Sequence, residues 1–203
     1  MKDTKIKEVC QFRISLNGIK PPVWRRILVP SSYSFWDLHV AIQDAMGWAD
    51  YHLHIFRVKD PITDKKVEIG LPDKDDLRFG WKILPDHKEK ILKYFTEKNP
   101  TASYEYDFGD GWLHSIRFEG LIPASSRKKY PECTAGKKAC PPEDCGGPQG
   151  YYNMLKILKD PGHEDYEMMM DWTGGGFNPD YFDPEDVDFE DPGERFDMMM
   201  GSR

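Results

Sequence analysis

One segment, residues 104–118, constrains the fold of this chain more than any other. It reads Tyr-Glu-Tyr-Asp-Phe-Gly-Asp-Gly-Trp-Leu-His-Ser-Ile-Arg-Phe, two alternating apolar runs that meet at Gly109-Asp110-Gly111. Alternation with a period of two is typical of strands that bury one face, and glycine-rich sequences between two such runs are typical of tight turns. The segment therefore predicts a β-hairpin, and the fold must contain an antiparallel pair of strands.

The length of the turn decides which residue lies opposite His114. A two-residue turn at Asp110-Gly111 pairs Asp107 with His114, whereas a three-residue loop with Gly111 in the left-handed conformation pairs Tyr106 with it. We favour the three-residue loop because it gathers the large side chains on one face of the hairpin. That face carries Tyr104, Tyr106, Phe108, Trp112, His114, Ile116 and Phe118. His114 is then either a hydrogen-bonded core residue or part of a site.

A further hairpin is predicted at the start of the chain. Residues 8–16 alternate, with Cys10, Phe12, Ile14 and Leu16 on one face, as expected for a half-buried strand. Asn17-Gly18 and Pro21-Pro22 interrupt this pattern, and the β-branched run 23–29 predicts the second strand. Arg25 and Arg26 in this run are interpreted as exposed charges.

A helix is predicted next, at residues 35–46. Ser34 followed by Asp37 resembles a capping box, and Gly47 suits the position just after a helix. Residues 52–58 predict a third strand, 67–69 a short strand, and 86–97 a helix. Residues 151–159 and 163–172 predict short C-terminal helices.

These elements predict a single α+β domain spanning residues 1–203, with a mixed or antiparallel sheet. The hairpin–helix–strand start is similar in order to a β-grasp core, and the 104–118 hairpin extends the sheet. Three regions are predicted to be irregular: the stretch 60–86, the cysteine-, proline- and glycine-rich loop 127–150, and the acidic segment 173–203.

Charge and composition narrow the classes of function. The net charge is −7, and residues 159–203 hold 14 acidic against 3 basic residues. Such a tail repels phosphates, so a protein partner is favoured over nucleic acid. The N-terminus has no apolar leader and no apolar run is long enough for a membrane span, so we expect a soluble, cytoplasmic protein without a membrane partner.

Two groups of residues are candidates for a functional site. His52 and His54 are two apart in a predicted strand, so both face one side, and with His114 they could form a metal or substrate pocket. Its candidate residues are His52, His54, Tyr106, Asp107, Asp110, Trp112 and His114, with Asp107 or Asp110 supporting the histidines.

The second group is Cys133, Cys140 and Cys145, whose spacing is C-x6-C-x4-C. The spacing lacks the C-x-x-C pair that makes a zinc prediction specific, and a fourth ligand would have to be His163, Asp144 or a residue of another chain. Zinc is therefore considered but not favoured, and structural free thiols are preferred over both zinc and a disulfide.

The motifs, taken together, resemble a known family. They are Pro-Pro-Val-Trp-Arg-Arg at 21–26, Leu38-His39, His-Leu-His-Ile-Phe at 52–56, Tyr-Asp-Phe-Gly-Asp-Gly-Trp-x-His at 106–114 and Cys-Pro-Pro-Glu-Asp-Cys-Gly-Gly at 140–147. In this order they are similar to the plasmid pRiA open-reading-frame-three-like family, the insertion-element passenger TnpR-like proteins. The resemblance implies an α+β domain associated with mobile elements and carries over no catalytic residue.

Two functions follow from the sequence as hypotheses. The first is a binding or adaptor module that uses an exposed surface of aromatic and histidine side chains. The alternative is a metal-dependent, hydrolytic enzyme built on His52, His54 and His114. A deep pocket with perturbed titratable groups would favour the enzyme, and a shallow surface with separated histidines would favour the module.

Overall fold

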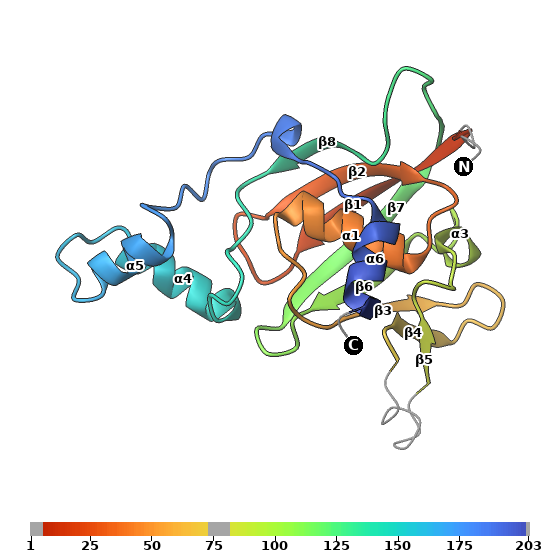
Figure 1. The fold of residues 1–203 in the computed structure, drawn as a ribbon. Helices are drawn as coiled ribbons and strands as arrows, with labels where there is room; N and C mark the ends of the chain where they lie inside the picture. Colours follow the sequence, from red (N-terminus) through yellow and green to blue (C-terminus); the bar gives the residue numbers. More distant parts are fainter. Residues whose placement is uncertain (1–5, 73–81, 202–203) are drawn as a thin grey trace.

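The computed structural model describes residues 6–72 and 82–201, and within them one mixed sheet dominates the fold (Figure 1). Its strands are β1 (Glu8–Leu16), β2 (Trp24–Pro30), β3 (His54–Lys59), β4 (Lys66–Gly70), β5 (Ile83–Pro85), β6 (Thr101–Tyr106), β7 (Trp112–Pro123) and β8 (Glu132–Lys137). The strand order is β5-β4-β3-β6-β7-β1-β2-β8, antiparallel throughout except for the parallel pair β4 and β5. The α+β class is thereby confirmed, while the β-grasp-like order stays a prediction.

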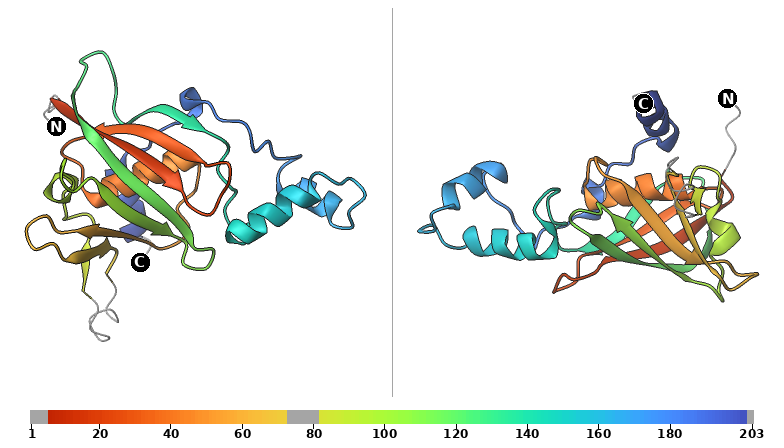
Figure 2. Two further views of the ribbon diagram at one scale, coloured as in Figure 1. Left: turned by 180° about the vertical axis from the view of Figure 1, so that it is seen from behind. Right: turned by 90° about the horizontal axis from the view of Figure 1, so that it is seen from below.

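Helices cover one face of this sheet. The helices of the described residues are α1 (Phe35–Met46), α3 (Ile91–Tyr94), α4 (Gly147–Ile157), α5 (Tyr166–Trp172), the 3₁₀ helix η1 (Pro184–Asp186) and α6 (Pro192–Gly201). Figure 2 shows α1 against the sheet with α6 outside it, and no helix in front of the opposite face. The pair α4 and α5 projects from the body as an arm (Figures 1 and 2). Within the described residues, no helix has the length and apolar character required to cross a membrane.

The elements with the clearest sequence signals form where predicted. The alternating face of β1 is buried, and α1 spans residues 35–46. Ser34 Oγ accepts the Asp37 N–H at 3.2 Å, and the Asp37 carboxylate accepts the Ser34 N–H at 2.7 Å, which is the capping box expected from the sequence. Gly47 ends the helix at φ +84°, a conformation that costs glycine little.

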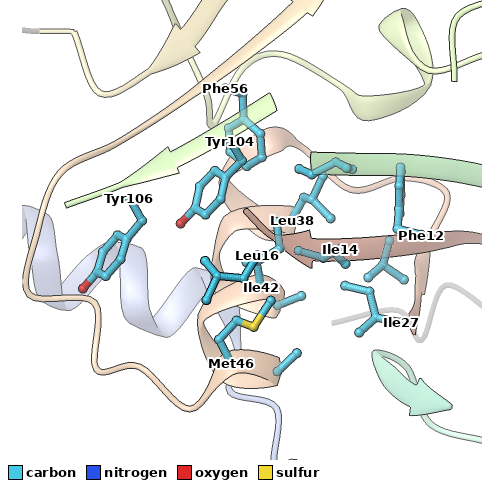
Figure 3. Packing of buried hydrophobic residues seen from close by; sticks show 14 of the residues in the cluster. Phe12, Ile14, Leu16, Ile27, Leu38, Ile42, Met46, Phe56, Tyr104 and Tyr106 are labelled. Atoms are coloured by element: carbon cyan, nitrogen blue, oxygen red, sulfur yellow. The ribbon is translucent and has the colours of Figure 1, made fainter. Parts of the chain in front are cut away.

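The hydrophobic core lies between α1 and the sheet. Figure 3 shows Leu38, Ile42 and Met46 of the helix facing Ile14 and Leu16 of β1, with Tyr104 and Tyr106 of β6 alongside. All seven side chains are buried. Burial of this apolar area on one side leaves charged residues on the uncovered face, where Arg57 bonds Glu68 and Glu105.

The hairpin register differs from both predicted alternatives. Tyr104 lies opposite His114, and Tyr106 lies opposite Trp112, so the connecting loop has five residues, 107–111. The chain leaves the strand at Asp107, which adopts φ +53° and accepts the Gly111 N–H at 2.7 Å through its carbonyl. Because of this local turn, the backbone pairing between the two strands ends at Tyr106 and Trp112, and Phe108 is exposed.

Two features of the predicted hairpin are confirmed despite the longer loop. Gly111 has φ +68°, in the left-handed region. The predicted buried face is also correct apart from Phe108, because adding two residues to a loop preserves the alternation of the strands. Its buried members are Tyr104, Tyr106, Trp112, His114, Ile116 and Phe118.

Three predicted segments need correction. The helix expected at 86–97 is only the single turn α3, because residues 83–85 pair as β5 and Lys90 and Ser34 form an isolated bridge. The loop 127–150 contains β8, which pairs with β2. The irregular segment 173–203 contains α6, which packs on α1. Each of these elements depends on a partner distant in sequence. Part of the predicted loop 60–86, residues 73–81, lies outside the described residues.

Candidate functional site

Three loops that contain sequence motifs meet at one end of the sheet. We call residues 48–54, 106–111 and 140–147 together the three-loop surface. Trp48 Nε1 donates to the Pro141 carbonyl at 2.9 Å, and the Gly146 N–H donates to Asp110 Oδ2 at 3.0 Å. Segments 93 and 36 positions apart are therefore joined by direct hydrogen bonds.

Glu143 and Tyr106 connect the three loops through hydrogen bonds. The Ala49 N–H donates to Glu143 Oε2 at 2.7 Å, and the Tyr106 hydroxyl donates to Glu143 Oε1. The same hydroxyl accepts the Tyr51 N–H at 3.0 Å. Burial and the neighbouring Glu143 carboxylate raise the pKa of Tyr106, so the phenol is protonated and acts as a fixed donor.

His52 faces two carboxylates on the three-loop surface. Its Nε2 lies 2.9 Å from Asp144 Oδ1 and 3.8 Å from Asp107 Oδ2. Ligand atoms of the three residues all lie within 4.8 Å of one another. Asp107 is nearly buried, whereas 64% of the Asp144 side chain is exposed. The group is thus partly open to solvent.

A second titratable group lies below the surface, between α1 and β3. His39 Nδ1 lies 2.8 Å from the Tyr104 hydroxyl, and His39 Nε2 lies 2.8 Å from Asp50 Oδ1. His54 Nε2 lies 3.0 Å from Asp86 Oδ2. The two imidazole rings stack with centroids 3.5 Å apart and planes at 11°. Each buried histidine therefore has a carboxylate of its own.

Burial controls the charge of His39. It lowers the pKa of His39 to about 4, and the facing His54 acts in the same direction. Burial acts to raise the pKa of Asp50, but the charge and hydrogen bond of His39 outweigh it and leave that pKa below its ordinary value. The pair is held as a neutral imidazole hydrogen-bonded to an ionised carboxylate at neutral pH.

His39, Asp50 and His54 also have ligand atoms within 4.8 Å of one another. The stacking disfavours a shared metal, because the nitrogen lone pairs of an imidazole lie in the ring plane, and two nearly parallel planes 3.5 Å apart do not direct them to one point. This group is better described as a buried hydrogen-bonded network.

His114 lies in the core of the hairpin. Its Nδ1 is 3.0 Å from the Trp112 carbonyl, and its Nε2 has no hydrogen-bond partner within the described part of the chain. Burial lowers the pKa of His114 to about 4, so the ring is neutral at physiological pH. The Trp48 ring packs edge-on against it.

The structure divides the residues that the sequence suggested as one pocket. Four of them belong to the three-loop surface: His52, Tyr106, Asp107 and Asp110. His54, Trp112 and His114 are buried, and so are Tyr106 and Asp107, so that only His52 and Asp110 of the seven are partly exposed. His52 precedes β3, which begins at His54, so the two histidines do not share a strand face.

Sequence reasoning missed several members of these groups. Asp144 was considered only as a fourth ligand of the cysteines, and Glu143 was not singled out, although both stand inside the Cys-Pro-Pro-Glu-Asp-Cys motif. His39 was noted only as part of the Leu38-His39 motif. Asp50 and Asp86 gave no local signal, because each acts through a histidine from another element.

The candidate metal ligands Cys133, Cys140 and Cys145 are free thiols. Within the described residues, no group of three close ligand atoms includes a cysteine sulfur. Burial raises the pKa of Cys140 and that of Cys145 to about 12, so both are protonated at neutral pH.

Arg25, expected on the surface, is buried close to these thiols. Its guanidinium donates to the carbonyls of Ala45, Trp24, Lys137 and Lys138, and it stacks on the Phe182 ring with Cζ 3.6 Å from the centroid. Desolvation lowers its pKa. Arg26 is partly exposed and forms an ion pair with Glu119 at 2.7 Å.

A groove of about 830 Å³ runs between the 47–54 segment and the C-terminal segment. Four acidic side chains line it: Asp44 of α1, Asp50 of the 47–54 segment, and Asp188 and Glu190 of the C-terminal segment. Tyr51 contributes exposed aromatic surface, Trp36 and Trp48 line the groove as buried side chains, and His52 joins the groove to the three-loop surface. Arg195 also lines the groove but is paired with Asp44 at 2.7 Å and Glu190 at 2.8 Å.

Together these features define an α+β protein with one sheet face covered by helices and three motif-bearing loops joined at its end. The model of the plasmid pRiA4b ORF-3-like protein family matches residues 8–188, and the chain belongs to this family.

Two relatives agree with this assignment. The chain is 35% identical over 170 residues to the uncharacterized protein y4hQ of Sinorhizobium fredii, covering 83% of this chain and 82% of that protein. It is 46% identical to the crystal structure of a protein of unknown function, MM3350, from Methanosarcina mazei Go1. That match has a TM-score of 0.83 and covers 91% of this chain and 99% of the other.

Proposed function

We propose that the protein is a non-enzymatic binding module that recognises a cationic segment of a protein partner in the groove between the 47–54 and C-terminal segments. The observation that carries this proposal is the lining of the groove, which combines four carboxylates with aromatic side chains. Carboxylates and aromatic faces both attract Lys and Arg side chains.

Exposed apolar residues at the groove support a protein ligand. Tyr51 is 77% exposed and Leu53 is 53% exposed, and they flank His52. Large exposed apolar residues next to charges are typical of interaction surfaces. The net charge of −7 further favours a basic partner over a polyanion.

The bonding of the histidines leads us to prefer this module over the hydrolytic enzyme. An enzyme built on His52, His54 and His114 needs all three imidazoles to act on one ion or substrate. His54 is bonded to the buried Asp86 and His114 to the Trp112 carbonyl. His52 alone of the three reaches the surface.

The compartment and the biological setting are also proposals. The four cysteines are free thiols, which suits a reducing cytoplasm. Membership of a family named for a plasmid reading frame supports an association with mobile elements.

To test the proposal, the full chain is titrated with a peptide of Lys and Leu, and binding is measured by calorimetry and by tryptophan fluorescence. We expect binding that weakens as salt rises, and no binding of the same peptide with Glu in place of each Lys. Asp188→Asn, an exposed groove residue, should weaken binding by about two- to five-fold. Tyr51→Ala should weaken it further.

The matched control is Glu167→Gln, which removes one negative charge from an exposed position on α5, outside the groove. Its affinity for the Lys peptide should equal that of the unaltered chain. Equal losses in Asp188→Asn and Glu167→Gln, or equal binding of both peptides, would show that the groove does not select cationic segments.

A further inference from the structure

His52 lies between two carboxylates, an arrangement that binding of a cationic segment in the groove does not explain. His52 Nε2 lies 2.9 Å from Asp144 Oδ1 and 3.8 Å from Asp107 Oδ2. Each of the three residues comes from a different loop of the three-loop surface. One imidazole nitrogen and two carboxylate oxygens thus converge on one partly exposed position.

We propose that His52, Asp107 and Asp144 form a binding site for a divalent transition-metal ion. Ligand atoms about 2.1 Å from an ion lie about 3.0 to 3.4 Å apart in octahedral or tetrahedral arrangements. The two distances from His52 Nε2 fall on either side of this range. Small side-chain rotations, mainly of the exposed Asp144, bring all three atoms into coordination.

The surrounding hydrogen bonds orient Asp107 for this role. Its Oδ1 accepts the Gly109 N–H at 2.9 Å, which leaves Oδ2 directed toward His52. Ligating carboxylates in metal sites are commonly held by such a second hydrogen bond. The neighbouring Glu143 and Asp110 are engaged by backbone N–H groups, so they add negative potential without competing as ligands.

The donor set selects the class of ion. An imidazole nitrogen favours Zn²⁺ or Co²⁺ over Ca²⁺ and Mg²⁺, which prefer oxygen ligands alone. Three protein ligands leave further coordination positions for water or for a donor atom of a partner.

The test is calorimetric titration of the full chain with Zn²⁺ and Co²⁺, with Mg²⁺ for contrast, and a parallel measurement of the melting temperature. We expect one ion per chain, a higher melting temperature, and a Co²⁺ spectrum without a thiolate charge-transfer band. Asp144→Asn and His52→Ala should each weaken binding at least about ten-fold. Asp144→Asn keeps the shape of an exposed side chain, so it should fold.

The control is a second surface His–Asp pair, His163 and Asp165, whose side-chain atoms lie 3.8 Å apart. His163→Ala and Asp165→Asn should leave the affinity unchanged. A thiolate band would assign the ion to the cysteines, and loss of binding in Asp50→Asn alone would assign it to the buried histidine pair. Either result, or undiminished binding in His52→Ala, would overturn the proposal.

Discussion

The imidazole rings of His39 and His54 stack face to face, with centroids 3.5 Å apart and planes 11° from parallel. Each ring bonds its own carboxylate, Asp50 for His39 and Asp86 for His54. Burial is the main cause that lowers the pKa of His39, and the facing His54 is the next. The pair connects α1 to the start of β3 beneath the groove.

The first prediction concerns the pH dependence of stability. Burial lowers the folded-state pKa of His39 and of His114 to about 4, below the ordinary value of 6.5. Between these values the unfolded chain binds protons that the folded chain does not, so the free energy of unfolding should fall as the pH is lowered from about 6.5 to about 4. The loss should reach at most roughly 3 kcal/mol for each histidine.

Urea denaturation at a series of pH values measures this dependence. The His114→Gln variant lacks one of the two titrating groups and should show a smaller loss over the same range. A free energy of unfolding that stays constant between pH 6.5 and 4 would contradict the assignment of both rings as buried and neutral.

The second prediction concerns Asp86, which is fully buried. Its carboxylate pairs with His54 at 3.0 Å and accepts the His87 N–H at 2.6 Å. Asp86→Ala leaves both groups without a partner and should destabilise the fold by about 3 kcal/mol or more. Asp86→Asn keeps one acceptor oxygen and should cost clearly less. Equal destabilisation by the two substitutions, measured by urea denaturation, would argue against the hydrogen bonds as the cause.

The third prediction separates backbone strain from close contact at two glycines. Gly111 and Gly147 both have positive φ, but a Cβ on Gly111 meets nothing within 4 Å. A Cβ on Gly147 would lie 2.4 Å from the Asp110 carbonyl oxygen, where the cysteine loop touches the hairpin turn.

Gly111→Ala should therefore cost about 1 kcal/mol from backbone strain alone. Gly147→Ala should cost more and should also loosen the three-loop surface, seen as faster amide exchange near Asp110. Similar melting temperatures for the two variants would show that the contact between the loops contributes little.

The fourth prediction uses the neighbouring residues Arg25 and Arg26. The buried Arg25 guanidinium donates to four carbonyls and stacks on Phe182. A lysine cannot satisfy these carbonyls from one ammonium, so Arg25→Lys should cost about 2 kcal/mol or more. Arg26→Lys weakens a partly exposed pair with Glu119 and should cost less than about 1 kcal/mol. Thermal denaturation of both variants gives the comparison, and equal costs would contradict it.

The sequence was sufficient for elements whose signals are local. The alternation of residues 8–16 and the caps at Ser34 and Gly47 depend on neighbouring positions only, and β1 and α1 form as predicted. The alternation of the 104–118 hairpin likewise identified its buried face. Its register was wrong because Asp107 forms a turn of its own, through hydrogen bonds that the residue pattern does not specify.

Elements that need a distant partner were not predictable in the same way. β8 forms against β2, and α6 packs on α1, where Arg195 bonds Asp44. The acidic, methionine-rich composition of the last segment gives no strong periodic signal. These segments gain stability mainly from tertiary contacts rather than from intrinsic propensity.

The candidate site shows the same division. The sequence identified His52, Tyr106, Asp107 and Asp110 as chemically competent, because residue type and motif are local properties. Tertiary structure alone decided that His52 meets Asp144, 92 positions away, while His54 and His114 are buried. The function of a titratable side chain depends on its partners and its access to water, and both are set by contacts between segments far apart in the chain.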